Sequence, residues 1–96
     1  MKLSPFDPAD FIENDKDVIE YLNAALEEGD PEFFAKSVGI VMRARGMTKI
    51  AEETGLGRQN LYKAFAGGQS PTLNTLFKVL DALGISVKIA KREAAA

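Results

Sequence analysis

Cysteine, histidine and tryptophan are all absent from this chain of 96 residues. Without cysteine there is no disulfide framework and no thiol nucleophile. Without cysteine and histidine the usual sulfur and nitrogen ligands of zinc are missing, so we expect no metal site and no cofactor. No apolar run approaches the roughly 20 residues that span a bilayer, and the N-terminus lacks a secretory signal pattern. We therefore expect a cytoplasmic protein with no membrane partner.

Catalytic constellations are also missing. The two pairs of neighbouring carboxylates are Glu27-Glu28 and Glu52-Glu53. Neighbours on a helix point in different directions, so neither pair converges on one reacting atom. General acid–base chemistry needs two placed groups and a pocket, and the chain has no glycine-rich phosphate loop. The sequence predicts a protein that is not an enzyme.

Charge is divided unevenly along the chain, although the total is only −2. Residues 1–32 carry ten acids and two lysines, a net charge of −8, and residues 33–96 carry ten bases and four acids, a net charge of +6. Such asymmetry is typical of a protein with one basic part that faces nucleic acid and an acidic part that faces elsewhere. The alternative is that the acidic part is only a solvated surface.

Five segments repeat apolar residues at helical spacing and carry helix start and stop signals. Asn14 caps the first, and Asp30 followed by Pro31 starts the second. Gly39 lies inside the second helix, where it allows another helix to cross closely. The predicted helices cover residues 15–28, 31–45, 47–54 and 58–66, and a last one, capped by Ser70 or Thr72, ends at Gly84.

The remaining segments are an N-terminal arm and a C-terminal strand. Residues 1–13, with Pro5 and Pro8 on either side of Phe6, are expected to form an extended or turning arm. Apolar and polar residues alternate over residues 85–89, which predicts a half-buried strand. The fold class is therefore an all-α, five-helix domain with a short C-terminal β-strand. One domain covers residues 1–96: an acidic arm and helix (1–32), a helix-turn-helix core (33–84), and a strand and tail (85–96).

Residues 47–66 have the pattern of a helix-turn-helix, in which two short helices cross through a tight turn. Ala51 is small where the helices touch, Gly55 tolerates a left-handed turn, and Leu56 anchors that turn. The other inward positions are Ile50, Leu61 and Ala64.

The opposite face of the second short helix carries side chains that can read base edges. Arg58, Gln59 and Asn60 lie near its start, and Lys63 lies one turn later. Arginine can bridge two guanine acceptors, glutamine can pair with adenine, and recognition helices present their N-terminal residues to the bases. We expect these residues to bind double-stranded DNA. A helical hairpin with a polar surface is the alternative.

Aromatic residues are expected mainly in the core. Tyr62 either faces DNA or covers the edge of the core, and its helical phase beside Arg58 and Gln59 favours the surface. The phenylalanines assigned to the core are Phe33, Phe34, Phe65 and Phe77, and the apolar stripe of the last helix contains Leu73, Leu76, Phe77, Leu80 and Leu83.

The run GMTKIAEETGLGRQNLYKA, residues 46–64, resembles the lambda-repressor-like, or Xre-type, helix-turn-helix. More narrowly, YLNAALEEGDP, ARGMTKIAEETGLGRQNLYKA and SPTLNTLFKVLDALGI resemble the addiction-module antidote proteins, which are HigA-like antitoxins of type II toxin–antitoxin systems. The resemblance extends from about Phe6 to Val87. It implies an antitoxin that neutralises a RelE-type ribonuclease toxin and represses its own operon.

Two positions depart from this class of repressor. Glutamine often begins the first helix of the motif and contacts phosphate, whereas this chain has Met47, so we expect Thr48 or Lys49 to make the contact. Serine or threonine often caps the recognition helix, whereas this chain has Gly57, which lacks the capping oxygen. The cost of that glycine is only a few tenths of a kcal/mol.

The expected partners are operator DNA, a second copy of the chain and a small basic toxin. A recognition helix alone covers too few base pairs, so a homodimer on a palindrome is expected. The strand 85–89 needs a ladder partner, which is either residues 3–6 or the same strand of a second subunit, and two-fold symmetry favours the latter. Acidic surface suits a basic toxin, so Glu20, Glu27 and Glu28 are candidate toxin contacts. The alternative is that these acids are only solvated and the toxin binds the C-terminal strand by β-augmentation.

Two further functions fit the same sequence. One is a repressor of the same fold without a toxin partner. The other is an adaptor that binds only proteins, which the base-reading cluster on the second short helix argues against.

Overall fold

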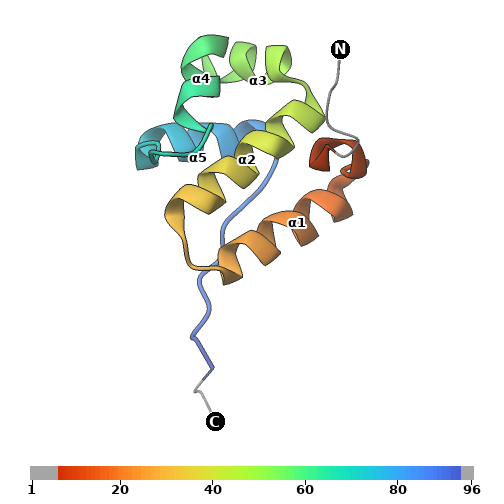
Figure 1. Cartoon of the computed structure of the whole chain (residues 1–96), viewed down its shortest axis with the longest axis vertical. Helices are drawn as coiled ribbons and strands as arrows, with labels where there is room; N and C mark the ends of the chain where they lie inside the picture. Colours follow the sequence, from red (N-terminus) through yellow and green to blue (C-terminus); the bar gives the residue numbers. More distant parts are fainter. Residues whose placement is uncertain (1–6, 94–96) are drawn as a thin grey trace.

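The computed structural model describes residues 7–93, which form one short 3-10 helix and five α-helices (Figure 1). The elements are η1 (Pro8–Phe11), α1 (Asp15–Glu27), α2 (Pro31–Arg45), α3 (Met47–Thr54), α4 (Arg58–Ala64) and α5 (Leu73–Ala82). α2 lies at the centre and contacts η1, α1, α3 and α4, while α5 packs against α3. Within this part of the chain the predicted all-helical class is confirmed, and no helix has the length and apolarity needed to cross a membrane.

The helix starts follow the capping residues. The side chain of Asn14 accepts a hydrogen bond from the amide of Asp17 at 2.9 Å, and Asp30 accepts one from Glu32 at 3.0 Å. Of the two candidate caps for α5, Thr72 is the one used, because its Oγ1 accepts from the amide of Thr75. These caps satisfy amide groups that have no partner within the helix.

The described part of the N-terminal arm takes the turning form of the two that the sequence prediction allowed. Residues 8–11 turn into η1, because the Asp7 side chain accepts from the amide of Ala9 and Pro8 fits the first helical position. Arg43 of α2 donates two hydrogen bonds to the same carboxylate, at 3.0 and 3.1 Å. This pairing raises the pKa of Arg43 and ties η1 to α2. Residues 3–6, one candidate partner for the C-terminal strand, lie outside the described residues.

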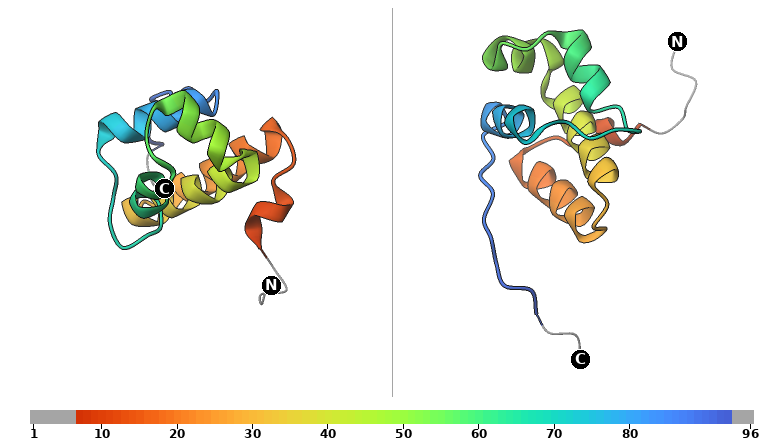
Figure 2. Two further views of the ribbon diagram at one scale, coloured as in Figure 1. Left: turned by 90° about the horizontal axis from the view of Figure 1, so that it is seen from above. Right: turned by 90° about the vertical axis from the view of Figure 1, so that its left-hand side faces the viewer.

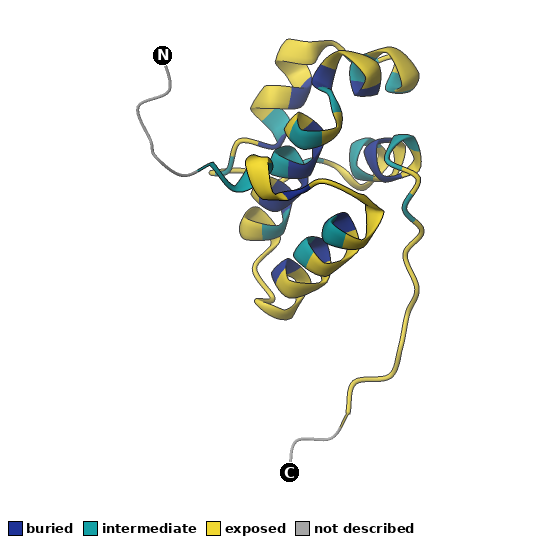
Figure 3. Ribbon diagram, turned by 90° about the vertical axis from the view of Figure 1, so that its right-hand side faces the viewer, coloured by how far each residue is buried: buried dark blue, intermediate teal, exposed yellow. Residues whose placement is uncertain are grey.

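The core lies where α2 meets its neighbours. Val38, Val41 and Met42 of α2 are completely buried, and Figure 3 shows the buried faces of the helices turned toward one another. The same cluster includes Ile50 of α3 and Val79 of α5, together with buried residues of α1 and α4. Burial of each such side chain contributes about 1.5–3 kcal/mol, so this cluster is the main source of stability.

Two of the four phenylalanines assigned to the core are not in it. Phe65 is buried and Phe34 is half-buried, as predicted. Phe33 and Phe77 are exposed, and Leu73 on the stripe of α5 is 73% exposed. The apolar stripe of α5 is wider than the face that meets the core: Leu80 of the stripe is buried and Leu76 and Leu83 are half-buried against the core, whereas Leu73 and Phe77 lie outside it.

The prediction of a strand at residues 85–89 is wrong for the single chain. Residues 85–93 have no regular secondary structure and run away from the helices (Figure 2). A strand requires a neighbouring strand that accepts its backbone hydrogen bonds. Within the described residues the segment has only the helix α5 beside it, which offers no such partner. α4 also ends at Ala64, two residues before its predicted end, because Phe65 leaves helical geometry to enter the core.

Gly39 allows the close crossing that the sequence predicted. A Cβ atom at this position would lie 2.6 Å from the carbonyl oxygen of Phe65 and 3.2 Å from its Cβ. The obstructing oxygen belongs to the backbone, so it cannot move without displacing the end of α4. The absence of a side chain at Gly39 therefore sets the distance between α2 and α4.

We expect Gly39→Ala to destabilise the protein by about 1–3 kcal/mol, the usual cost of overpacking. Alanine favours a helix by up to ~1 kcal/mol over glycine, so the steric effect has to exceed that gain. Urea unfolding followed by circular dichroism measures the change. Asn23→Ala, at an exposed position of α1, is the control and should be neutral or slightly stabilising. Equal stability of the Gly39→Ala variant and the wild type would contradict the tight crossing.

Candidate nucleic-acid interface

α4 lies across α3 with one side in the core. Leu61 is 1% exposed and Ile50 of α3 is equally buried, while Ala51, Leu56 and Ala64 are partly buried against them. These are the inward positions that the helix-turn-helix spacing predicted, and the structure confirms them. Because Leu61 faces inward, the residues on either side of it face solvent.

The turn between α3 and α4 is held by a threonine and a glycine. Gly55 adopts the left-handed conformation with φ of 74°, which favours glycine. Thr54 Oγ1 donates to the carbonyl of Ile50 at 2.8 Å and accepts from the amide of Leu56 at 3.2 Å. Sequence analysis identified Gly55 and Leu56 but missed Thr54. The only feature of the sequence that points to a role for Thr54 in the turn is its position directly before the glycine. The threonine fixes the direction in which the chain enters α4.

The outward side of α4 presents the polar residues singled out in the sequence. Arg58, Gln59, Asn60 and Lys63 are all exposed, and we call these four residues the recognition face. On α3, Thr48 and Lys49 are exposed as well. Within the described residues no acidic side chain forms an ion pair with Arg58 or Lys63. The positive charge of this face is therefore available to a ligand.

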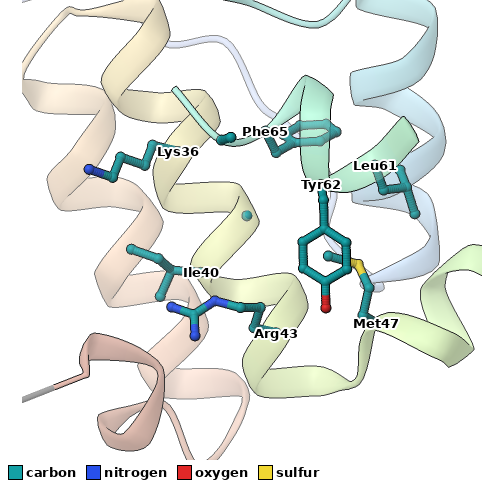
Figure 4. A pocket seen from close by; sticks show the side chains of 9 residues that line it. Lys36, Ile40, Arg43, Met47, Leu61, Tyr62 and Phe65 are labelled. Atoms are coloured by element: carbon teal, nitrogen blue, oxygen red, sulfur yellow. The ribbon is translucent and has the colours of Figure 1, made fainter. Parts of the chain in front are cut away.

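Tyr62 lies both at the surface and at the edge of the core, the two positions that the sequence allowed. It is 43% exposed, and the Arg58 guanidinium carbon lies 5.9 Å from the centre of its ring, a cation–π distance. Its other side lines a hollow between α2 and α4, where Figure 4 shows the ring between Arg43 and Met47. Arg58 Nη2 also donates to the Tyr62 hydroxyl at 3.4 Å. Both contacts restrict the position of the Arg58 guanidinium group on the surface of α4.

The two departures from the repressor pattern have structural counterparts. Met47 is buried and lines the same hollow as Tyr62, so it faces the core and cannot replace a polar contact. Gly57 is the N-cap of α4 and supplies no side-chain hydrogen bond, as expected from the sequence. The exposed residues Thr48 and Lys49 stand beside Met47 on α3.

Two further residues support or border this surface, and sequence analysis missed both. The Gln69 side chain donates to the carbonyl of Lys63 at 3.0 Å, which satisfies a backbone acceptor at the end of α4. Lys36 of α2 is exposed at the edge of the hollow beside Tyr62. A glutamine after two glycines carries no recognisable capping signal, and the position of Lys36 depends on the helix crossing at Gly39.

The three acidic residues proposed as toxin contacts lie on a different part of the molecule. Glu20 and Glu27 are on α1 and Glu28 is its C-cap, and all three are exposed. α2 separates α1 from α4 (Figure 1). Among residues 7–93, Glu20 has only a long, solvent-exposed ion pair with Lys16, at 4.0 Å, which contributes little. The structure therefore keeps these acids apart from the recognition face.

Comparisons with known proteins identify one family model and one relative that match most of the chain. The family model described as "Probable addiction module antidote protein" matches residues 2–91. An uncharacterized protein of Haemophilus influenzae is 35% identical over 88 residues, which cover 92% of this chain and 91% of that protein. No solved structure matches.

Thr54→Val should destabilise the protein by about 1–2 kcal/mol, because valine keeps the shape of threonine but leaves the amide of Leu56 without its acceptor. The loss is measured by urea unfolding. Thr48→Val makes the same change at an exposed position of α3 and should alter stability by less than roughly 0.5 kcal/mol. A Thr54→Val variant as stable as Thr48→Val would show that the hydroxyl does not hold the turn.

Proposed function

The chain belongs to the family of addiction module antidote proteins, and on that basis we propose that it is a HigA-like antitoxin with an Xre-type helix-turn-helix. In this proposal it binds operator DNA through α4, represses its own operon, and neutralises a small basic toxin of the RelE type. It performs no catalysis itself. Because operator and toxin meet in the bacterial cytoplasm, that is where we place its action.

The observation that carries the DNA-binding proposal is the contrast between the two sides of α4. Leu61 is fully buried, whereas Arg58, Gln59, Asn60 and Lys63 are all exposed and free of acidic partners within the described residues. Side chains of these types bind base edges and phosphates in the major groove. A protein-binding adaptor has no need of this combination. Tyr62 adds a rigid support that reduces the freedom lost when Arg58 binds.

The acids of α1 support the toxin half of the proposal. Several acids of the N-terminal part already serve the fold, since Asp7 pairs with Arg43, Asp15 pairs with Arg45, and Asp30 caps α2. Within residues 7–93, Glu27 and Glu28 form no side-chain hydrogen bond or ion pair. Acids without an internal partner are suited to attract a basic protein and to discriminate among partners. Toxin and operator then occupy separate surfaces.

We also propose that the chain acts as a homodimer on a palindromic operator. One recognition helix contacts only a few base pairs, and useful specificity requires two half-sites. Two-fold symmetry of the protein matches two-fold symmetry of the operator. The phosphate contact at the start of α3 falls to Thr48 or Lys49, because Met47 is buried.

Arg58→Ala should weaken binding to the chain's own promoter by roughly 1–3 kcal/mol, the range for a lost bidentate contact to guanine. Gel shifts at several salt concentrations measure this. Lys63→Ala should weaken binding and flatten its salt dependence. The control is Lys16→Ala on α1, which should leave both unchanged. Wild-type affinity in a double Arg58→Ala, Gln59→Ala variant would rule out α4 as the recognition helix.

Changing Glu20, Glu27 and Glu28 together to lysine should abolish rescue of cells that express the cognate toxin, while operator binding persists. Reversed charge repels a basic partner and leaves α4 untouched. The control is the double variant Glu52→Lys, Glu53→Lys, which makes the same kind of change on α3 and should still rescue. Full rescue by the triple variant would place the toxin on another surface. Loss of operator binding would instead mean that α1 supports the fold through these residues.

A further inference from the structure

A groove lies between η1 and α1, which are neighbours in the fold (Figure 1). It has a volume of about 360 Å³, within the range of roughly 300–1,000 Å³ that is usual for ligand sites. Two aromatic side chains line it, Phe11 from η1 and Tyr21 from α1. Phe11 is 64% exposed, and Tyr21 is half-buried against the core. We call this hollow the N-terminal groove.

One face of α1 supplies four residues of the lining, Asp17, Glu20, Tyr21 and Ala24. Their spacing follows the helical repeat, so the aromatic ring and both carboxylates lie on the same side of the helix. Val18 and Leu22 lie on the next face and are buried in the core, which holds the helix in place. The groove therefore combines apolar walls with two acids that are close neighbours on the helix surface.

The η1 side of the groove is held by contacts that do not involve its aromatic ring. Ile12, the C-cap of η1, is buried in the core, and Asp7 pairs with Arg43 of α2. Phe11 itself does not belong to the hydrophobic core. A change at Phe11 should therefore alter the groove and leave the fold intact.

Both carboxylates of the groove can accept further hydrogen bonds. Asp17 accepts one from the amide of Glu13 at 2.9 Å, which fixes its orientation, and an ionised carboxylate has about four acceptor sites. Among the described residues Asp17 forms no ion pair, and Glu20 has only the long contact with Lys16. The negative charge of the groove is therefore largely uncompensated.

Charge identifies the kind of partner that fits this groove. Residues 7–28 carry eight acids and one lysine. DNA is repelled by such a surface, and two copies of the chain that met symmetrically here would bring acids against acids. A basic protein is attracted instead.

Among basic side chains, arginine matches the lining of the groove. Its guanidinium group is planar and weakly hydrated, stacks on aromatic rings, and binds carboxylates through parallel hydrogen bonds. The ammonium group of lysine is a compact and strongly hydrated charge, which gains less from aromatic walls. The pairing of two rings with two acids therefore favours arginine.

We propose that the N-terminal groove receives an arginine side chain of a basic partner protein. The aliphatic part of that side chain packs against Phe11 and Tyr21, and its guanidinium group pairs with Asp17 and Glu20. The identification of the partner as the toxin rests on the function proposed above. Phe11, which sequence analysis did not single out, thus gives the toxin an apolar anchor beside the acids of α1.

Nuclear magnetic resonance of the isotope-labelled full chain tests the groove without any partner protein. N-acetylarginine amide should bind in the millimolar range and shift the amide signals of Phe11, Asp17 and Tyr21. N-acetyllysine amide should bind about three-fold more weakly, because it gains less from stacking on the rings. Phe11→Ala should weaken binding of the arginine probe by a similar factor, and Phe33→Ala, at an exposed phenylalanine of α2, should not. Equal binding of the two probes, or wild-type binding by Phe11→Ala, overturns the proposal.

Calorimetric titration with the cognate toxin tests the partner. Phe11→Ala should weaken toxin binding by more than about thirty-fold, the loss expected at a hot spot, with an unchanged helical signal in circular dichroism. Asp17→Asn should also weaken it, because asparagine keeps an acceptor for the amide of Glu13 and removes the charge. Phe33→Ala is again the control and should bind like the wild type.

The outcomes separate this proposal from the function on which it rests. A Phe11→Ala chain that binds the toxin like the wild type overturns the arginine site. A change in sedimentation of the free Phe11→Ala chain, with toxin binding retained, would make a second copy the occupant and overturn it as well. A wild type that binds the arginine probe in the groove but binds no toxin would overturn the antitoxin function and leave the arginine site intact.

Discussion

The contact between Gly39 of α2 and the backbone of Phe65 determines where α4 lies. A Cβ atom at Gly39 would come within 2.6 Å of the Phe65 carbonyl oxygen, so the two helices lie closer together than any side chain at this position allows. α2 also contacts α1, α3 and η1, and a shift of α2 would therefore disturb every one of them. Apolar packing around Leu61, on the buried side of α4, therefore fixes the position of the recognition face. The polar side chains on the opposite side remain available to a ligand.

Local interactions explain why much of the fold could be predicted from the sequence. Asn14 and Asp30 cap the helices that follow them through amides only two or three residues away, so the signal lies within the segment itself. η1 was missed because its carboxylate, Asp7, is held by Arg43, which lies 36 residues later. Phe77 was assigned to the core because it belongs to an apolar stripe with helical periodicity. Periodicity does not show which residues of such a stripe pack against another helix.

The recognition face followed from helical phase, since an inward Leu61 requires outward residues on either side of it. The parts that support this face could not be predicted in the same way. Thr54 and Gln69 act through side chains whose rotamers depend on the completed turn and loop. Tyr62 remained ambiguous for a physical reason, because one side of its ring meets solvent and the other lines a hollow that exists only after α2 and α4 have packed.

The unpaired segment after Gly84 also bears on how long the protein survives in a cell. Exposed chain without backbone partners is where proteolytic cleavage concentrates, and residues 86–93 present such a stretch in the single chain. Any partner that covers the segment protects it from cleavage. The rate of degradation then depends on how much of the protein is covered in this way, so loss of the partner shortens the lifetime of the chain.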